Sequence, residues 1–276
     1  MDQDSREWIP FEDAPWSSEQ QILFQFILKW SRALKKISVE EKDPDILKKM
    51  FADEAVSVEE HLTGNLIPQS LVDELKLHAD QADLPLAWFA SQIKGSYRYY
   101  SPVSFASGKE LKDFLADTVV AQGKLVAKLI DVAHRWQIPQ VTDLATAFFL
   151  VRKLVNLKDE LAEGRLFIPL ADLEQAGVSM EDLKLGNNNP QMQKMLWKQI
   201  VRVRDAFAQG QPLVKEVPRK FRRTFKRNWL TGLELIGEVE KRNYDIWTAP
   251  IELTKTQNFQ ITVLSFIGKG AAKARG

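Results

Sequence analysis

Hydrophobic residues recur every three or four positions along most of the chain, which is the spacing of an amphipathic α-helix. Long stretches of this kind cover about residues 23–37, 111–133, 144–155, 192–207 and 221–239, and a shorter one covers 259–267. Alternation with a period of two, which is typical of half-buried strands, is nearly absent. The pattern therefore predicts an all-α protein.

Helix start signals precede three of the long stretches. Ser17 with Gln20 and Ser107 with Glu110 have the spacing of a capping box, and Thr142 is a candidate N-cap for the third stretch. Prolines and glycines fall between the stretches, and none of these breaks resembles a long linker. The sequence therefore predicts well-separated helices that are joined by short connections.

We expect a single-domain helical bundle over residues 16–268. Residues 1–15 would form an N-terminal extension, and residues 269–276 would form a flexible basic tail. A bundle of this size can enclose a central cavity between its helices, and ligand sites of bundles usually lie there.

Composition narrows the function classes. The 38 Lys and Arg against 37 Asp and Glu give a net charge of +1, so we expect no nucleic-acid partner. The absence of cysteine excludes disulfides, thiolate metal sites and cysteine nucleophiles. No apolar run reaches the roughly 18 residues that span a bilayer, and the acidic start lacks the apolar core of a signal peptide. We expect a cytoplasmic protein, with association at a membrane surface as an option.

Residues 163–183 carry the most informative motif. They read EGRLFIP, then ADL, then AGVSMEDL, which resembles the squalene/phytoene synthase pattern GR-[IV]-Y-L-P, DL and FGVS-x-x-DL. Further segments resemble that family in the same order: 83–95, 110–123, 144–160 and 240–246. The resemblance covers roughly residues 15–268 and implies an isoprenoid-synthase-like fold.

This resemblance also implies a chemistry. Members of the family join two prenyl diphosphates head to head and bind Mg²⁺ through two aspartate-rich motifs, DD-x-x-D and D-x-x-x-D. Diphosphate departs as an anion only if its charge is neutralised, and Mg²⁺ prefers the hard oxygens of carboxylates. Aspartates spaced by four residues lie on one helix face and point at the same ion.

The chain departs from both aspartate motifs. The second motif falls on Asn156 and Glu160, with Asp159 adjacent, which would leave a residual metal site that we expect to be non-functional. The first motif should lie within Arg32–Ile37, which reads RALKKI and would repel Mg²⁺. Tyr99 stands where an aspartate is expected after Gly95.

These departures favour loss of the Mg²⁺-dependent condensation, and they leave three functional interpretations open. In the first, the protein binds a prenyl lipid or a protein partner. In the second, it is an active prenyl transferase of the squalene/phytoene synthase type with an altered metal and diphosphate site. In the third, it is a peripheral membrane scaffold or assembly factor. No cofactor is expected, except Mg²⁺ if the second interpretation holds.

Candidate substrate-binding residues are basic, aromatic or amide side chains close to the expected motifs. They are Arg152, Lys153, Arg165, Gln122, Phe149 and Tyr99. Lysine and arginine can hold a diphosphate without a metal ion. Structural alternatives remain for several of them: an ion pair of Arg165 in the loop after its helix, a solvated face for Arg152 and Lys153, and a core position for Tyr99.

Residues 215–229 contain seven Lys or Arg and one Glu. Three aromatic residues recur there at every fourth position, as expected of a basic helix at an anionic membrane surface. The candidate membrane residues are Phe221, Arg222, Arg223, Phe225, Lys226 and Trp229. The alternative is an aromatic stripe in the protein core with a solvated basic face.

Overall fold

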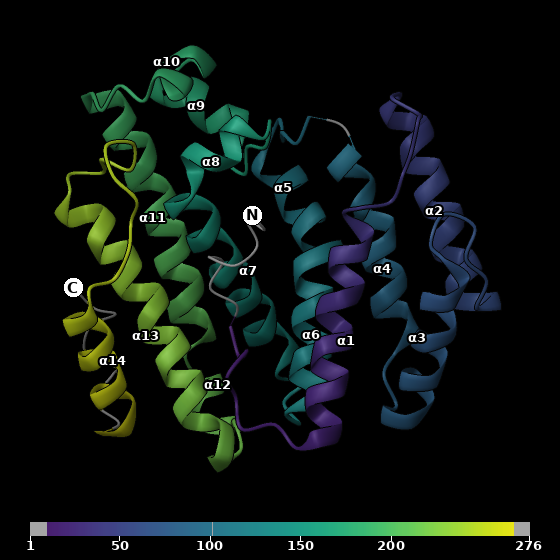
Figure 1. The fold of residues 1–276 in the computed structure, drawn as a ribbon. Coiled ribbons are helices and arrows are strands. Elements are labelled where there is room, and N and C mark those ends of the chain that lie inside the picture. Colours follow the sequence, from purple (N-terminus) through teal and green to yellow (C-terminus); the bar gives the residue numbers. More distant parts are fainter. Residues whose placement is uncertain (1–9, 101, 268–276) are drawn as a thin grey trace. The chain divides into compact units, whose positions relative to one another are not determined.

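The computed structural model describes residues 10–100 and 102–267 (Figure 1). These residues form α-helices with one 3-10 segment, η2 (Tyr97–Tyr100), and one π segment, η3 (Ala116–Val120). The helices are α1 (Ser18–Leu34), α2 (Pro44–His61), α3 (Gln69–Ala82), α4 (Leu86–Ser96), α5 (Gly108–Leu115), α6 (Ala121–Leu129), α7 (Ile138–Val155), α8 (Leu157–Ala162), α9 (Leu170–Ala176), α10 (Met180–Leu185), α11 (Pro190–Gly210), α12 (Leu213–Glu216), α13 (Arg219–Lys241) and α14 (Lys255–Ile267). The all-α prediction is confirmed.

The described chain divides into two compact units, and the boundary falls inside α7 between Ala145 and Thr146. The N-terminal unit comprises Trp16–Val103 and Lys109–Ala145. The described part of the C-terminal unit comprises residues 10–15, Ser104–Gly108 and residues 146–267. The expected domain boundaries and central cavity stay predictions, and the predicted tail 269–276 lies outside the described residues.

In the N-terminal unit, α1 lies beside α4 and α6, and α2 packs against α4 (Figure 1). The core contains Trp30 of α1, whose ring meets the edge of Phe89 of α4 at 5.5 Å between centroids. The predicted capping box starts α1: the Gln20 amide N–H donates to Ser17 Oγ at 3.2 Å, and the Ser17 N–H donates to Gln20 Oε1 at 3.1 Å.

The stretch predicted as one helix over 111–133 is interrupted by the π segment η3. Helix α4 approaches this segment closely, because a Cβ atom at Gly95 would lie 2.6 Å from Thr118 Cγ2. Only glycine fits there without a shift of its neighbours. The predicted cap of the next helix is wrong, because α7 begins at Ile138 and Thr142 therefore lies inside it.

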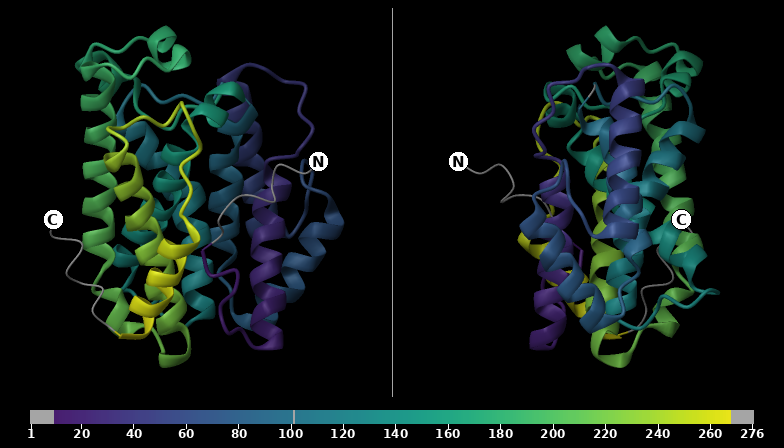
Figure 2. Two further views of the ribbon diagram at one scale, coloured as in Figure 1. Left: turned by 60° about the vertical axis from the view of Figure 1, so that its left-hand side comes forward. Right: turned by 90° about the vertical axis from the view of Figure 1, so that its right-hand side faces the viewer.

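In the C-terminal unit, α13 packs against both α11 and α14, and the left view of Figure 2 shows these helices together. Phe207 of α11 meets Phe148 of α7 edge to face at 5.4 Å between centroids. The Trp229 indole of α13 donates a hydrogen bond to the Phe207 carbonyl at 3.2 Å. This aromatic layer fixes α13 against α11 and determines which face of α13 is buried.

Candidate functional site

The helix that should carry the second aspartate motif is broken at Asn156. Helix α7 ends at Val155, α8 begins at Leu157, and Asn156 between them has φ −105° and ψ 20°. The Asn156 amide donates to the Arg152 carbonyl at 3.0 Å. Asn156 and Glu160 lie four residues apart across this interruption, and the Glu160 N–H still donates to the Asn156 carbonyl at 3.0 Å.

Glu160 of α8 is the buried carboxylate of this region, and its side chain is 7% exposed. Lys153 Nζ lies 2.6 Å from one carboxylate oxygen, and Arg165 Nε lies 2.6 Å from the other. The Lys153 ammonium also sits over the rings of Phe149 and Phe167, at 5.5 and 5.6 Å from their centroids. We call Lys153, Glu160 and Arg165 the charge triad.

A tight turn brings Arg165 back to α8. Gly164 adopts a left-handed conformation with φ 72°, and the Arg165 N–H donates to the Glu160 carbonyl at 2.8 Å. The Arg165 guanidinium pairs with Glu163 as well as with Glu160. Burial lowers the pKa of Arg165, but hydrogen bonds and the charges of Glu160 and Glu163 outweigh it and raise the pKa above its ordinary value. This arrangement agrees with the structural ion pair that was the alternative for Arg165.

The donor set of the charge triad does not fit Mg²⁺. Both oxygens of Glu160 are engaged by cations, and a divalent ion would have to displace Lys153 and Arg165 against their repulsion. Asn156 offers only a neutral amide, whose nitrogen donates to the Arg152 backbone carbonyl. Asp159 lies on the exposed side of α8. Among the described residues, no group of three or more His, Asp or Glu side chains is arranged to hold a metal ion.

The segment that replaces the first aspartate motif lies at the end of α1 in the N-terminal unit. Lys35 lies over the Tyr99 ring at 5.5 Å, and Tyr99 meets Phe114 edge to face at 5.6 Å. The Tyr100 hydroxyl donates to the Leu34 carbonyl and accepts from the Ile37 N–H at 2.9 Å. Aromatic and hydrogen-bonding contacts therefore hold the end of this helix.

Tyr100 is the residue that sequence reasoning missed in this segment. Burial raises the pKa of its hydroxyl to about 12, although the hydrogen bond from the Ile37 N–H opposes this shift. Its ring also stacks on Phe51 of α2, with centroids 5.2 Å apart. The cluster of tyrosines at 97–100 was the available signal, but it did not show which hydroxyl would reach α1.

The predicted substrate-binding residues separate into two groups. Lys153, Phe149 and Arg165 gather around Glu160 in the C-terminal unit, with Arg152 next to Lys153 in sequence. Gln122 and Tyr99 belong to the N-terminal unit. Phe167, which completes the aromatic side of the Lys153 environment, was missed, although it stands at the tyrosine position of the GR-[IV]-Y-L-P pattern.

The aromatic side chains of residues 215–229, which were candidates for membrane contact, are buried. Phe221, Phe225 and Trp229 are 1%, 2% and 3% exposed and belong to the core. Arg222 donates to the Val217 carbonyl, Lys226 is half-buried, and Arg223 is exposed. The stripe is thus the core face of α13, and any membrane contact of its basic residues stays a prediction.

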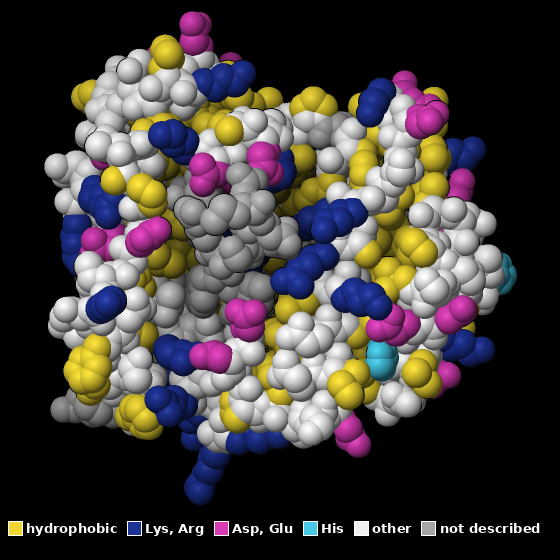
Figure 3. Space-filling view, in the orientation of Figure 1, with side chains coloured by type: hydrophobic (Ala, Val, Ile, Leu, Met, Phe, Trp, Pro, Cys, Tyr) yellow, Lys and Arg dark blue, Asp and Glu magenta, His cyan; other side chains and the backbone are white. Residues whose placement is uncertain are grey.

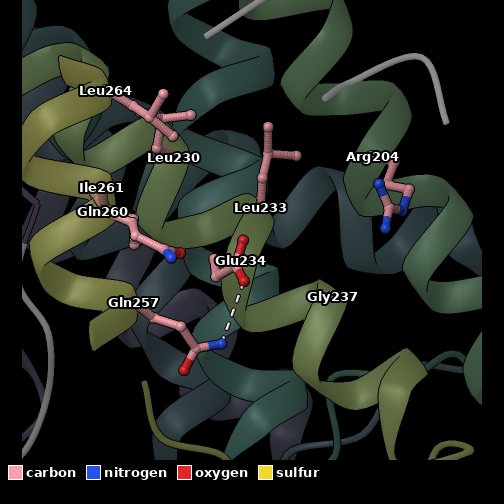
Figure 4. Close-up of a pocket in the computed structure, with 9 residues that line it drawn as sticks. All are labelled: Arg204, Leu230, Leu233, Glu234, Gly237, Gln257, Gln260, Ile261 and Leu264. Atoms are coloured by element: carbon pink, nitrogen blue, oxygen red, sulfur yellow. Dashed lines mark hydrogen bonds between the residues drawn. The ribbon is translucent and has the colours of Figure 1, made fainter. Parts of the chain in front are cut away.

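A small pocket lies between α13 and α14, with Arg204 of α11 at its edge (Figure 4). Its volume is about 140 Å³, and Leu230, Leu233 and Ile261 supply apolar wall. Gln257 donates to Glu234 at 3.2 Å across one side of it. No predicted substrate-binding residue lines this pocket, so it is distinct from the charge triad.

Within residues 10–100 and 102–267, no helix is both long and apolar enough to cross a bilayer.

Comparison with known proteins identifies relatives of the chain. The family model of squalene/phytoene synthase matches residues 32–260. The chloroplastic phytoene synthase of Narcissus pseudonarcissus is 25% identical over 130 residues, which cover 46% of this chain and 31% of that protein. The 15-cis-phytoene synthase of Synechococcus elongatus is 25% identical over 113 residues, which cover 40% and 37%. The match thus spans about a third of the length of these curated relatives.

Solved structures share the fold at low sequence identity. Squalene synthase HpnC from Alicyclobacillus acidocaldarius has a TM-score of 0.69 at 18% identity, covering 82% of this chain and 85% of that one. A dehydrosqualene synthase in complex with ligand has a TM-score of 0.72 at 13% identity, covering 94% and 89%. The fold is therefore isoprenoid-synthase-like. With the family model matched over most of its length, the chain belongs to the squalene/phytoene synthase family.

Proposed function

We propose that this protein acts on prenyl diphosphates, as a squalene/phytoene synthase-type transferase with an altered diphosphate site. The match of the family model over residues 32–260 is the observation that carries the proposal, since the family binds prenyl diphosphate substrates. The curated relatives are phytoene synthases, and they support this alternative better than the expectation that activity is lost.

Basic side chains supply the positive charge that the proposal requires. Lys153 and Arg165 both contact Glu160, and the Lys153 ammonium lies over the rings of Phe149 and Phe167. Arg152 adds a third cation in the same stretch. A bound diphosphate would replace the Glu160 carboxylate as the partner of these cations, because phosphate oxygens accept the same charge-assisted hydrogen bonds as a carboxylate. In the relatives' reaction Mg²⁺ neutralises this charge; in this chain Lys153 and Arg165 would do so.

A second candidate is a protein that binds a prenyl lipid or a protein partner without condensing its ligand. The engagement of both Glu160 oxygens by cations favours it, because a carboxylate held in this way is poorly placed to bind Mg²⁺. A prenyl-lipid-binding protein would share diphosphate recognition by the chain's own cations with the transferase, and the two would differ in whether a carbon–carbon bond forms.

One experiment tests both candidates. Purified protein is incubated with farnesyl or geranylgeranyl diphosphate, with Mg²⁺ or with EDTA, and binding and products are measured in the same samples. Presqualene diphosphate, squalene or phytoene in the products supports the transferase. Saturable binding without product, unchanged by EDTA, supports the second candidate. Failure to bind either diphosphate under both conditions overturns the proposal.

A matched pair of variants identifies the site. Lys153→Gln removes one cation of the charge triad, and we expect diphosphate binding to weaken by about tenfold, as for loss of one charge-assisted contact. Lys158→Gln removes an exposed lysine of α8 and should leave binding unchanged. Equal binding by the two variants would place the diphosphate elsewhere.

A further inference from the structure

Helix α14 exposes an apolar stripe along one face. Phe259 is 70% exposed, Phe266 is 63% exposed, and Val263 lies between them at helical spacing. The opposite face is buried through Ile261 and Ser265 and packs on α13. We call Phe259, Val263 and Phe266 the α14 stripe. A contiguous exposed apolar patch that is rimmed by polar residues marks an interaction surface.

A cluster of cations adjoins one end of this stripe. Arg219, Lys220 and Arg223 are exposed in the first turns of α13. The Arg223 guanidinium lies 3.6 Å from the centre of the Phe266 ring, so the basic and aromatic groups form one continuous surface. Figure 3 shows hydrophobic side chains beside Lys and Arg side chains along the lower left edge, where α14 and the start of α13 lie.

The sequence around the stripe has a single sign of charge. From residue 253 to the C-terminus it contains four Lys or Arg and no Asp or Glu. Three of these cations, Lys269, Lys273 and Arg275, follow α14 directly in the sequence. The described surface is thus apolar along α14 and basic at the start of α13. The sequence after α14 adds three further cations.

We propose that the α14 stripe and the basic start of α13 bind the surface of an anionic lipid bilayer. Aromatic rings inserted at the headgroup level gain apolar burial, while neighbouring Lys and Arg are attracted by anionic headgroups. Because the charged groups beside the stripe are cations, the lipid surface that they favour is anionic. This inference does not depend on the proposed function, since none of these residues belongs to the charge triad.

Vesicle flotation tests the proposal with vesicles of phosphatidylcholine alone and vesicles that also contain phosphatidylglycerol. The intact protein should float with the anionic vesicles, and added salt should release it because exposed charges are screened. Phe259→Ser combined with Phe266→Ser should lower the bound fraction by about tenfold, as expected when two rings lose their burial. Lys220→Gln combined with Arg223→Gln should also lower it by roughly tenfold.

Control variants carry the same chemical changes on other helices. Trp197→Ser removes an aromatic residue of α11 that is 51% exposed, and Lys158→Gln combined with Lys184→Gln removes two exposed lysines. Both controls should float like the intact protein. Equal losses in test and control variants, or no loss in the test variants, would overturn the proposal.

Sedimentation without lipid addresses the competing occupant, a second copy of the chain. If the proposal holds, the sedimentation coefficient is the same for the intact protein and for the Phe259→Ser and Phe266→Ser double variant. A lower coefficient for the variant would mean that another copy covers the α14 stripe, and the lipid proposal would then be wrong.

Discussion

The two segments that correspond to the family's aspartate motifs have changed in different ways. At the second, a carboxylate is present, but Lys153 and Arg165 neutralise Glu160 in a largely buried position. At the first, Lys35 packs on an aromatic ring, and Tyr100 hydrogen-bonds the end of α1. One segment keeps a cluster of paired charges, whereas the other is a helix end held by aromatic and hydrogen-bonding contacts.

This difference indicates what each segment can still do. A buried ion-pair cluster depends on all its members, because removal of one leaves an uncompensated charge. Its cations can also exchange a carboxylate for another anion. A helix end held by a tyrosine contributes stability but offers no such exchange. The charge triad is therefore the segment in which ligand binding is expected to matter.

The largest expected effect comes from Glu160→Gln. The substitution leaves Lys153 and Arg165 facing each other without their shared carboxylate, and we expect a loss of about 3 to 5 kcal/mol in the free energy of unfolding. Urea denaturation at neutral pH measures it. Increased stability would show instead that Glu160 is a strained functional carboxylate, and the two segments would then differ less than we argue.

Glu163→Gln is the matched control for that variant. Glu163 pairs with the same arginine, but its side chain is 44% exposed. An exposed ion pair contributes only about 0 to 1 kcal/mol, so this loss should be small. The double variant Lys153→Met with Glu160→Leu should recover part of the stability lost in Glu160→Gln, because it removes both charges and leaves Arg165 its partner Glu163.

A second buried carboxylate separates the charge triad from ordinary structural pairing. Asp172 of α9 accepts hydrogen bonds from Arg202 and Gln199 of α11, and Lys198 Nζ lies 2.9 Å from it. Asp172→Asn should lower the free energy of unfolding by about 2 to 3 kcal/mol at neutral pH through loss of charge-assisted hydrogen bonds. Diphosphate binding should not change, in contrast to the effect of a substitution at Lys153.

The free energy of unfolding at acidic pH tests the role of Asp172 further. Burial raises the pKa of Asp172, but hydrogen bonds from Arg202 and Lys198 outweigh it and hold the pKa below its ordinary value. Because the folded pKa is lowered, the contribution is present at neutral pH and is lost as pH falls from about 4 through the folded value. Urea midpoints of the intact protein and of Asp172→Asn should therefore converge in acid; a constant difference down to pH 2 would contradict the assignment.

Much of the fold could be predicted from periodicity and caps, and the failures have physical causes. The capping box at Ser17 and the long α13 pattern needed only local sequence. The break at Asn156 was not predicted; the Asn156 amide donates to the Arg152 carbonyl, a local bond of the kind that competes with the helix. Periodicity identified the hydrophobic faces of α13 and α14, but it cannot tell which face meets the core, so the buried aromatic face of α13 stood as a candidate for membrane contact.

The site was predictable as a set of residues but not as a set of partners. The sequence placed Lys153, Glu160 and Arg165 near the second motif, and an ion pair of Arg165 was one expected outcome. The turn at Gly164, with φ 72°, decides that Arg165 returns to Glu160. Tyr100 was missed because its partners lie more than 60 residues away along the chain.

Tyr100→Phe tests the role of Tyr100 at the end of α1, the segment that replaces the first aspartate motif. It removes a donor to the Leu34 carbonyl and an acceptor for the Ile37 N–H, and about 1 to 2 kcal/mol of stability should be lost. Tyr97→Phe is the control from the same 3-10 segment and should cost less. Since the folded pKa is raised to about 12, the Tyr100 contribution should be complete below about pH 10 and decline above it. An unchanged alkaline limb in Tyr100→Phe would refute this role.

The smallest expected effect is that of Lys35→Met. Lys35 is exposed, and its ring contact with Tyr99 is of the kind that contributes about 0.5 to 1 kcal/mol at a surface. Lys36→Met is the adjacent exposed control and should change stability less. Neither substitution should weaken diphosphate binding if the first segment is purely structural. A loss of diphosphate affinity in Lys35→Met, measured by titration calorimetry beside Lys153→Gln, would show that the basic end of α1 also takes part in anion binding and would remove the functional distinction between the two segments.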